Sequence, residues 1–154
     1  MTVRTTPIDE HETTEQLEPR LALIGVKPVH DAIKMLESWD RESLIGEKQD
    51  PSLTSRAPRL HKSDGAVDWS KSATEIYNKF RALKPWPGSF TQWERPNGQK
   101  LRLLLDDIRI SDTRAEEPGR VIASDGNNFE VGAGYGAIKV LKVQPAGKRV
   151  MAID

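Results

Sequence analysis

The sequence has no cysteine, no long apolar run and only 6% aromatic residues. Without cysteine, disulfides and thiolate metal sites are excluded. No stretch approaches the roughly 18 to 20 apolar residues that a membrane span needs, and residues 1–16 lack the apolar core of a signal peptide. The mean hydropathy of −0.59 agrees with these absences. We therefore expect a cytoplasmic protein.

Groups that carry catalysis are also scarce. The three histidines, His11, His30 and His61, lie far apart and lack metal-ligand spacing, so we expect surface or capping roles for them. Asp106 and Asp107 are adjacent in a predicted strand and point to opposite faces, which prevents shared acid–base work. The sequence thus predicts no catalytic residue, no cofactor-binding residue and no metal ligand in this chain.

The charges balance over the whole chain but not within its parts. The sequence has 23 basic and 23 acidic residues, yet residues 1–55 carry 6 basic and 11 acidic ones, and the remainder carries 17 and 12. A surplus of +5 after residue 55 makes that part a candidate for binding a polyanion. The alternative is an ordinary solvated surface, which such a surplus also fits.

Basic residues spread over the predicted linker, helix, strands and C-terminal loop are the candidate contacts to RNA phosphates. They are Arg56, Arg59, Lys62, Lys71, Arg81, Lys84, Arg95, Lys100, Arg102, Lys139, Lys142, Lys148 and Arg149. Trp86 and Trp93 are candidates for stacking on unpaired bases. Because Trp86 stands between two prolines, a packing role is favoured for it.

Helical spacing and turn residues predict the first elements. Residues 3–6 are expected to form a strand, and a helix capped by Thr13 or Thr14 is expected to stop at Gly25, with Pro19 bending it or delaying its start. A second helix is predicted from Pro28. Residues 43–68 have the composition of a linker.

The rest of the sequence predicts one helix and five strands. Ser72 and Glu75 have the spacing of a capping box, and a helix follows with an apolar face of Ala73, Ile76, Tyr77, Phe80 and Leu83. Strands are expected at residues 89–94, 100–110, 119–123, 128–133 and 137–144, with type I′ turns at Asn97-Gly98 and Asp125-Gly126.

These elements predict an α+β protein. It is a small five- to six-stranded β-barrel of the oligonucleotide-binding (OB) kind with one packed helix, preceded by a helical segment and a linker. The glycines Gly132, Gly134 and Gly136 precede a strand pattern and not a helix, so a turn between strands is favoured over a dinucleotide-binding loop.

Several motifs resemble one known family in the right order. The matching runs are Ala57-Pro58-Arg59-Leu60, Asp64-Gly65-Ala66-Val67-Asp68-Trp69-Ser70, Pro85-Trp86-Pro87-Gly88, and Gln144-Pro145-Ala146-Gly147-Lys148. Together they resemble the C-terminal domain of methionyl-tRNA formyltransferase, while residues 1–53 resemble, more weakly, the last part of its catalytic domain.

The resemblance implies a tRNA-binding role in translation initiation. In this family, 10-formyltetrahydrofolate donates a formyl group to methionyl initiator tRNA through an Asn, a His and an Asp that lie upstream of the part matched here. His11, His30 and His61 match none of these, so we expect a chain that binds no cofactor and is inactive alone. Residues 1–45 would be a helical tail of the catalytic domain, 46–68 a linker, and 69–154 the OB-like domain.

Two alternatives to tRNA binding stay open. In the first, the chain is an interaction module that completes a separate catalytic domain. In the second, it is a remnant without function. The remnant alternative predicts that charge reversal at Arg59, Lys62 and Arg81 has no cellular effect.

Overall fold

The computed structural model describes residues 2–114, 117–124, 126 and 128–153. Contacts within the chain group it into two compact units, Met1–Arg59 and Leu60–Asp154, hereafter unit 1 and unit 2. Within the described residues, no helix is long and apolar enough to cross a membrane. The predicted boundaries at residues 45 and 68 stay a prediction.

Unit 1 contains one long helix, α1 (Thr14–Glu37), and irregular chain. Thr13 is its N-cap, as predicted, and the Thr13 backbone N–H donates to Gln16 Oε1 at 2.9 Å. The prediction of two helices is wrong, because α1 continues through Gly25 and contains both Pro19 and Pro28. Each proline removes one backbone donor, but helix formers such as leucine, alanine and lysine on either side keep the helix continuous.

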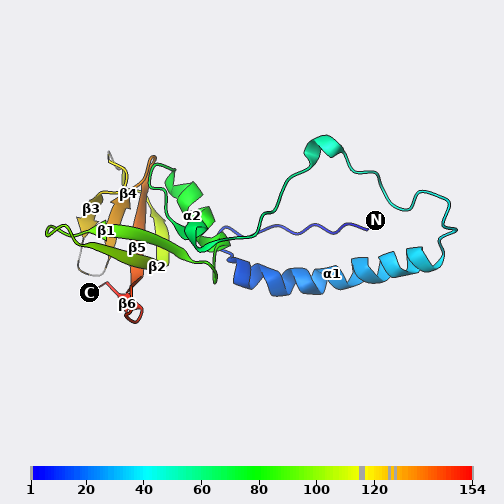
Figure 1. The fold of residues 1–154 in the computed structure, drawn as a ribbon, viewed down its shortest axis with the longest axis horizontal. Helices are drawn as coiled ribbons and strands as arrows, with labels where there is room; N and C mark the ends of the chain where they lie inside the picture. The colour runs from blue at the N-terminus through cyan, green and yellow to red at the C-terminus, as the bar shows by residue number, and fades with distance from the viewer. Residues whose placement is uncertain (1, 115–116, 125, 127, 154) are drawn as a thin grey trace. The chain divides into compact units, whose positions relative to one another are not determined.

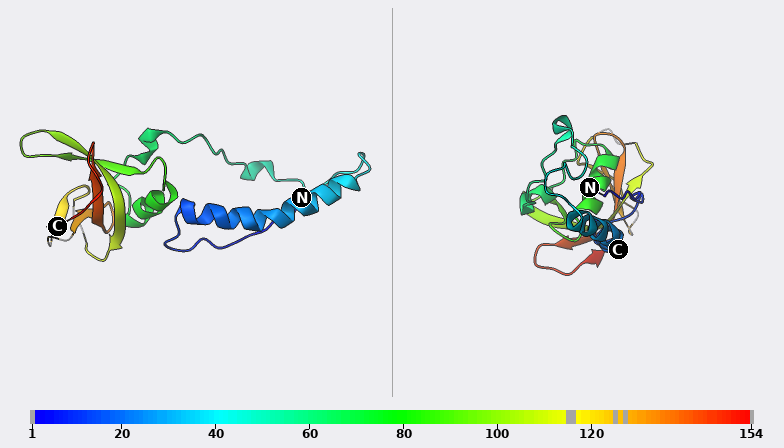
Figure 2. Two further views of the ribbon diagram at one scale, coloured as in Figure 1. Left: turned by 90° about the horizontal axis from the view of Figure 1, so that it is seen from below. Right: turned by 90° about the vertical axis from the view of Figure 1, so that its right-hand side faces the viewer.

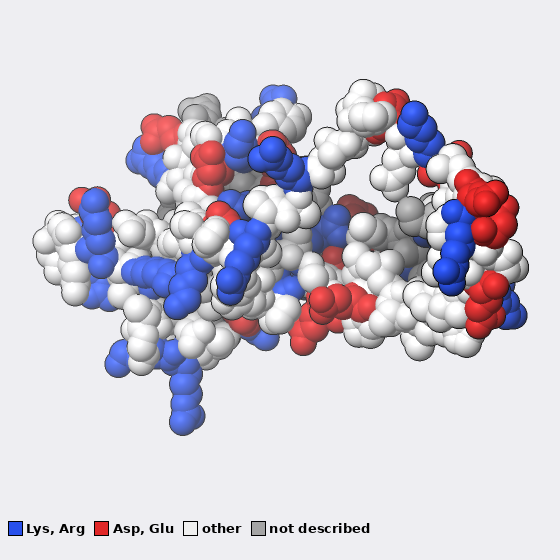
Figure 3. Space-filling view, turned by 45° about the vertical axis from the view of Figure 1, so that its right-hand side comes forward, with Lys and Arg blue, Asp and Glu red and all other residues white. Residues whose placement is uncertain are grey.

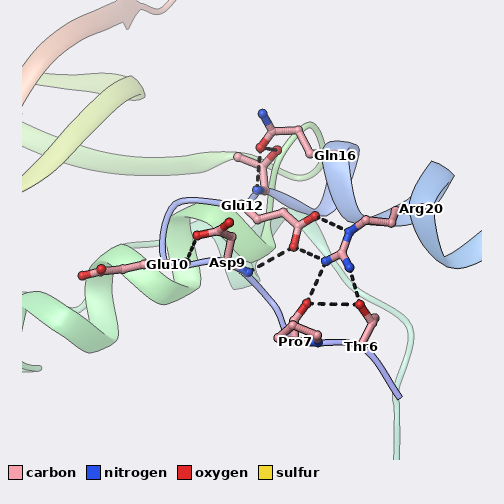
Figure 4. A network of polar contacts seen from close by, with 8 residues as sticks. Thr6, Pro7, Asp9, Glu10, Glu12, Gln16 and Arg20 are labelled. Carbon is pink, nitrogen blue, oxygen red and sulfur yellow. Dashed lines mark hydrogen bonds and ion pairs between the residues drawn. The ribbon is translucent and has the colours of Figure 1, made fainter. Parts of the chain in front are cut away.

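An arginine holds the segment before α1 against the helix (Figure 4). Arg20 forms an ion pair with Glu12, with Nη2 and Oε2 2.6 Å apart, and donates to the carbonyl oxygen of Pro7 at 2.8 Å. It also donates to the hydroxyl of Thr6. The predicted strand at residues 3–6 is not formed, because this stretch has no neighbouring strand to pair with among the described residues.

Unit 2 is a curled antiparallel sheet with a helix against it (Figure 1). The strands follow the order β1-β2-β5-β4-β3, and β6 pairs with β5. Their bounds are β1 Ser89–Glu94, β2 Lys100–Ser111, β3 Val121–Ser124, β4 Phe129–Gly132, β5 Ala137–Pro145 and β6 Met151–Ala152. The edges of β1 and β3 do not pair with each other, so the described sheet is a half-open barrel. The predicted α+β barrel-like fold is confirmed.

Helix α2 (Ala73–Ala82) packs on the inner face of the curled sheet. Its capping box is formed as predicted: Ser72 Oγ accepts from the Glu75 N–H, and Glu75 accepts from the Ser72 N–H at 3.0 Å. Ile76 and Phe80 are buried against Ile108 of β2 and other inner-face residues. The predicted apolar face is therefore the face that completes the core.

The segment before α2 crosses the sheet and touches it at several points. Ala66 pairs with Phe90 at the edge of β1. A Cβ on Gly65 would collide with the carbonyl oxygen of Gly88, and a Cβ on Gly134 would collide with that of Ser70. Only glycine permits such close approach of two backbones. The turn predicted at Gly132–Gly136 is confirmed, and it holds this segment.

The turn between β1 and β2 differs from the predicted type. Gly98 has φ +79°, but Asn97 is not among the residues with positive φ, so a type I′ turn is excluded. The Arg95 N–H instead donates to the carbonyl oxygen of Gln99 at 2.9 Å, and the Gly98 N–H to that of Arg95 at 2.8 Å. This is a longer hairpin loop with one left-handed glycine. Asp125 of the other predicted turn lies outside the described residues.

We expect Gly134→Ala to destabilise unit 2 by about 3 kcal/mol or more, because the new methyl group meets backbone and cannot be relieved by a side-chain rotation. Gly98→Ala is the control: it has open space around the added carbon and should lose only about 1–2 kcal/mol for its positive φ. Urea unfolding of both variants measures the difference, and equal losses would contradict the packing role of Gly134.

Candidate nucleic-acid interface

Four cations project from the outer face of the sheet. Successive strand residues point to opposite faces except at a bulge, and Leu103, Ile108, Val140 and Val143 are inner-face residues. The neighbouring basic side chains therefore lie outside. These outer-face cations are Arg102 and Arg109 of β2 and Lys139 and Lys142 of β5.

The strand register brings two of the outer-face cations together, and acidic neighbours neutralise part of their charge. Arg109 lies directly opposite Lys139. Like charges placed opposite each other repel, and here carboxylates reduce that repulsion. Asp107 binds Arg109, with Oδ1 and Nη1 2.6 Å apart, and Glu130 of β4 is the register partner of Lys139 on its other side. Sequence reasoning missed Arg109, although its place after Ile108 in the strand indicates its outward direction.

The β1–β2 hairpin carries three of the predicted cations and extends beyond the rest of the sheet (Figure 2). Arg95 lies beside Trp93, with the guanidinium carbon 5.4 Å from the ring centroid. Lys100 is 3.9 Å from Glu94, and both are largely exposed. Arg102 stacks over Phe90 at 3.9 Å. The aromatic contacts hold two arginines in place on this hairpin.

The cations near α2 differ in how free they are to bind a ligand. Lys71 is exposed, whereas Arg81 is half-buried and donates to Asn78 Oδ1 at 3.0 Å. Lys84 donates to the carbonyl oxygen of Asp106 and lies over the ring of Phe80 at 4.9 Å. Both contacts of Lys84 are made within unit 2, so its ammonium group is less available to a ligand.

The remaining predicted cations fall in loops. Lys62 begins a short 3-10 helix, and Lys148 and Arg149 lie in the exposed loop between β5 and β6. Arg56 and Arg59 belong to unit 1. With the chain divided at this structural boundary, unit 1 has 8 basic and 11 acidic residues and unit 2 has 15 and 12. On the face of unit 2 that Figure 3 draws, the blue Lys and Arg side chains cover more of the surface than the red Asp and Glu side chains.

A groove of about 510 Å³ opens on the inner face of the sheet. Apolar residues of β2, β4 and β5 form its floor, and Trp93 of β1 and Val121 of β3 stand on its two sides. Trp69 spans the gap between the unpaired edges, because its Nε1 donates to Thr91 Oγ1 at 3.0 Å and its ring packs against Gly119. Sequence reasoning missed this groove, although alternating apolar residues at 101, 103 and 105 mark its floor.

The two candidate stacking tryptophans differ in their surroundings. Trp93 is 46% exposed and lines the groove. Trp86 is 53% exposed and is not part of the core. The predicted packing role of Trp86 is therefore wrong: the prolines on both sides hold it in a loop at the surface.

Two carboxylates near the start of α2 are held in the charged form. Hydrogen bonds from the hydroxyl and backbone N–H of Ser70 lower the pKa of Asp68. Those from Ser72 lower the pKa of Glu75, and nearby Lys71 adds a smaller contribution to both shifts. Their local charge offsets that of Lys71, so this part of the surface is not strongly positive. The described residues include no group of three or more His, Cys, Asp or Glu suited to a metal ion.

The curled sheet with one helix on its inner face defines a small α+β barrel-like domain, with cations on its outer face and an apolar groove on its inner face. Residues 59–154 match the family described as formyl transferase, C-terminal domain. The chain belongs to this formyltransferase family.

Curated relatives extend the likeness into unit 1. A methionyl-tRNA formyltransferase from Rhodopirellula baltica is 39% identical over 97% of this chain and 46% of its own length. Another from Geotalea uraniireducens is 35% identical over 95% of this chain and 44% of its own length. This chain therefore spans about half the length of the relatives it matches.

Solved structures share the fold at low identity. A variant of HypX from Aquifex aeolicus covers 97% of this chain with a TM-score of 0.61 and 18% identity, using 26% of its own chain. A structure of HypX from the same organism in complex with tetrahydrofolic acid gives a TM-score of 0.57, with 18% identity over 97% of this chain and 25% of its own. These likenesses support the fold.

We expect the capping box of α2 to make stability depend on acid pH. Ser72→Ala should cost about 1 kcal/mol at neutral pH. Because the folded pKa of Glu75 is lowered, its contribution is present above the ordinary value of 4.5 and is lost as pH falls through the folded pKa. The difference between wild type and Ser72→Ala should therefore shrink in acid.

Urea unfolding at several pH values measures this difference. In a Glu75→Gln background, the cost of Ser72→Ala should no longer vary with pH, since the amide does not titrate. A cost that varies equally in both backgrounds would show that another group is responsible.

Proposed function

We propose that this chain is the tRNA-binding part of a methionyl-tRNA formyltransferase and acts in translation initiation. The observation that carries the proposal is the match to the formyl transferase C-terminal domain family together with the cations on unit 2. RNA affinity comes largely from neutralised phosphates. Arg102 and Lys142, both exposed on the outer face, are placed to contact a phosphate backbone.

The geometry supports some of the predicted contacts more than others. The hairpin, the outer face and the β5–β6 loop present exposed cations on unit 2, which favours them as phosphate contacts. The internal contacts of Lys84 favour a structural role for it. The curled antiparallel sheet supports an OB-like mode of binding, in which a small barrel presents one face and its loops to nucleic acid.

Formyl transfer itself would need residues that this chain does not supply. We infer that the donor, 10-formyltetrahydrofolate in this family, is bound by another part of the enzyme, and that this chain alone is inactive. His11, His30 and His61 are exposed and lie in different parts of the chain. We infer that such a chain acts in the cytoplasm, where initiator tRNA is formylated.

The proposal predicts salt-dependent binding of initiator tRNA. The affinity should fall steeply between about 50 and 200 mM salt. Replacing Lys139 and Lys142 by glutamine should reduce the slope of log affinity against log salt by about one for each phosphate that is no longer neutralised. Filter binding over a salt series measures the slope.

Lys27→Gln is the matched control for this experiment. Lys27 is 67% exposed on α1 and pairs with Asp31 at 3.1 Å, so its replacement removes one cation from unit 1 and leaves unit 2 unchanged. Its slope should equal that of wild type. Affinity that stays flat with salt, or no binding at low salt, would contradict the proposal.

A second candidate function is docking onto a separate formyltransferase catalytic domain. None of the residues of α1 is buried. Val26, Val29, Ile33 and Leu36 are 50–57% exposed and fall within about 80° of arc on the helix. A continuous apolar stripe on a long helix favours contact with another protein surface. This stripe supports an interaction role alongside RNA binding.

Charged side chains introduced into this α1 stripe should weaken such docking. We expect the chain to bind the N-terminal half of the Rhodopirellula baltica relative, and Val29→Glu with Ile33→Glu to weaken binding about tenfold or more, because the carboxylates would be desolvated. Leu23→Glu is the control, since Leu23 is 78% exposed and lies outside the stripe. Light scattering that shows no complex would contradict this function.

A further inference from the structure

The groove on the inner face of unit 2 has the size and lining of a ligand site. Its volume of about 510 Å³ lies within the range of small-molecule sites. The floor is apolar and belongs to the core, including Leu105 and Val140. Residues at the unpaired edges of β1 and β3 both line the groove, and the Trp69 side chain connects these two edges. An apolar groove of this kind can bind a flat, weakly polar chemical group.

The described residues at the groove favour an anionic and aromatic ligand. Arg95 is the one charged residue among the described residues that line it, so a positive charge meets no acidic neighbour there. Trp93 offers a large, half-exposed ring beside Arg95. Gln92 and Ser124 add hydrogen-bonding groups to the lining. An apolar floor, an aromatic ring and a cation together match a nucleotide, whose base stacks and whose phosphate is negative.

The loop between β5 and β6 adds positive charge next to the groove. Pro145 and Met151, at the two ends of this loop, both line the groove. Between them stand Lys148 and Arg149, and both are exposed. A strand of RNA that enters the groove would therefore meet cations where its neighbouring phosphates emerge. This charge complementarity favours RNA over an apolar peptide at the same edges.

We propose that the groove binds one unpaired nucleobase, stacked on Trp93, with Arg95 and the β5–β6 loop contacting the flanking phosphates. The proposal rests on the proposed function, since the base belongs to the bound RNA. It adds a site for single-stranded RNA to a surface that otherwise holds phosphates by charge. Paired bases are excluded, because a base inside a duplex cannot enter the groove.

The test compares two exposed tryptophans in the full chain. A short single-stranded oligouridylate is the probe, and binding is measured by fluorescence anisotropy of the labelled RNA. Trp93→Ala should raise Kd about tenfold or more, the usual effect of removing one base–aromatic stack. Trp86→Ala should leave Kd unchanged, since Trp86 is at least as exposed as Trp93 but is not among the described residues that line the groove. Trp93→Phe should keep most of the affinity.

Several outcomes would overturn the proposal. Equal Kd values for Trp93→Ala and wild type would do so, with thermal unfolding showing that both are folded. A blunt-ended RNA duplex without a loop would do so as well if its affinity fell on Trp93→Ala as much as that of oligouridylate. If an extended leucine-rich peptide shields the Trp93 indole from a quencher and oligouridylate does not, the groove is a peptide site.

The same experiments separate this proposal from the proposed function. Salt-dependent binding of initiator tRNA that is insensitive to Trp93→Ala would leave the proposed function standing and refute the groove site. Absence of both tRNA and oligouridylate binding would refute the proposed function itself.

Discussion

Unit 2 depends on the backbone contact between its β4–β5 turn and the segment that leads into α2. The Gly134 N–H donates to the carbonyl oxygen of Lys71 at 2.8 Å, and the Ala73 N–H donates to that of Tyr135 at 2.9 Å. These bonds fix the first turn of α2 against the sheet. Because the helix is held there, Ile76 and Phe80 fill the inner face beside it and leave the rest of that face as a groove. The position of α2 that this contact sets therefore determines both which residues form the core and where the groove lies.

The curl of the sheet gives unit 2 two faces with different chemistry. The inner face is apolar, and Trp69 joins the edges of β1 and β3 with a side chain in place of strand pairing. The outer face carries two cations on β2 and two on β5, and some of this charge is offset by Asp107 and Glu130. Such an arrangement places positive charge on one side and an apolar groove with an exposed tryptophan on the other. This difference between the faces is the basis of our proposal that one small domain combines electrostatic affinity with recognition of an unpaired base.

Local signals predicted the parts of the fold that local chemistry decides. The Ser72–Glu75 capping box and the apolar spacing after it located α2, and alternation with turn residues located the strands. Sequence reasoning failed where several residues act together. It read Gly25 and Pro28 as the boundary between two helices, but the helix formers on both sides decide the outcome. The groove and the internal contacts of Lys84 also depend on residues far apart in sequence, which periodicity along one strand does not reveal.

The two units differ in the kind of contact that they offer. Unit 1 is acidic and exposes an apolar stripe on α1, whereas unit 2 is basic and has a buried apolar core, an open apolar groove and cations on its outer face. Apolar contacts are nearly independent of salt, while contacts to phosphates weaken steeply as salt rises. The acidic surplus of unit 1 also disfavours RNA binding there. A net charge of zero therefore does not argue against a polyanionic ligand, because unit 2 by itself carries 15 basic and 12 acidic residues.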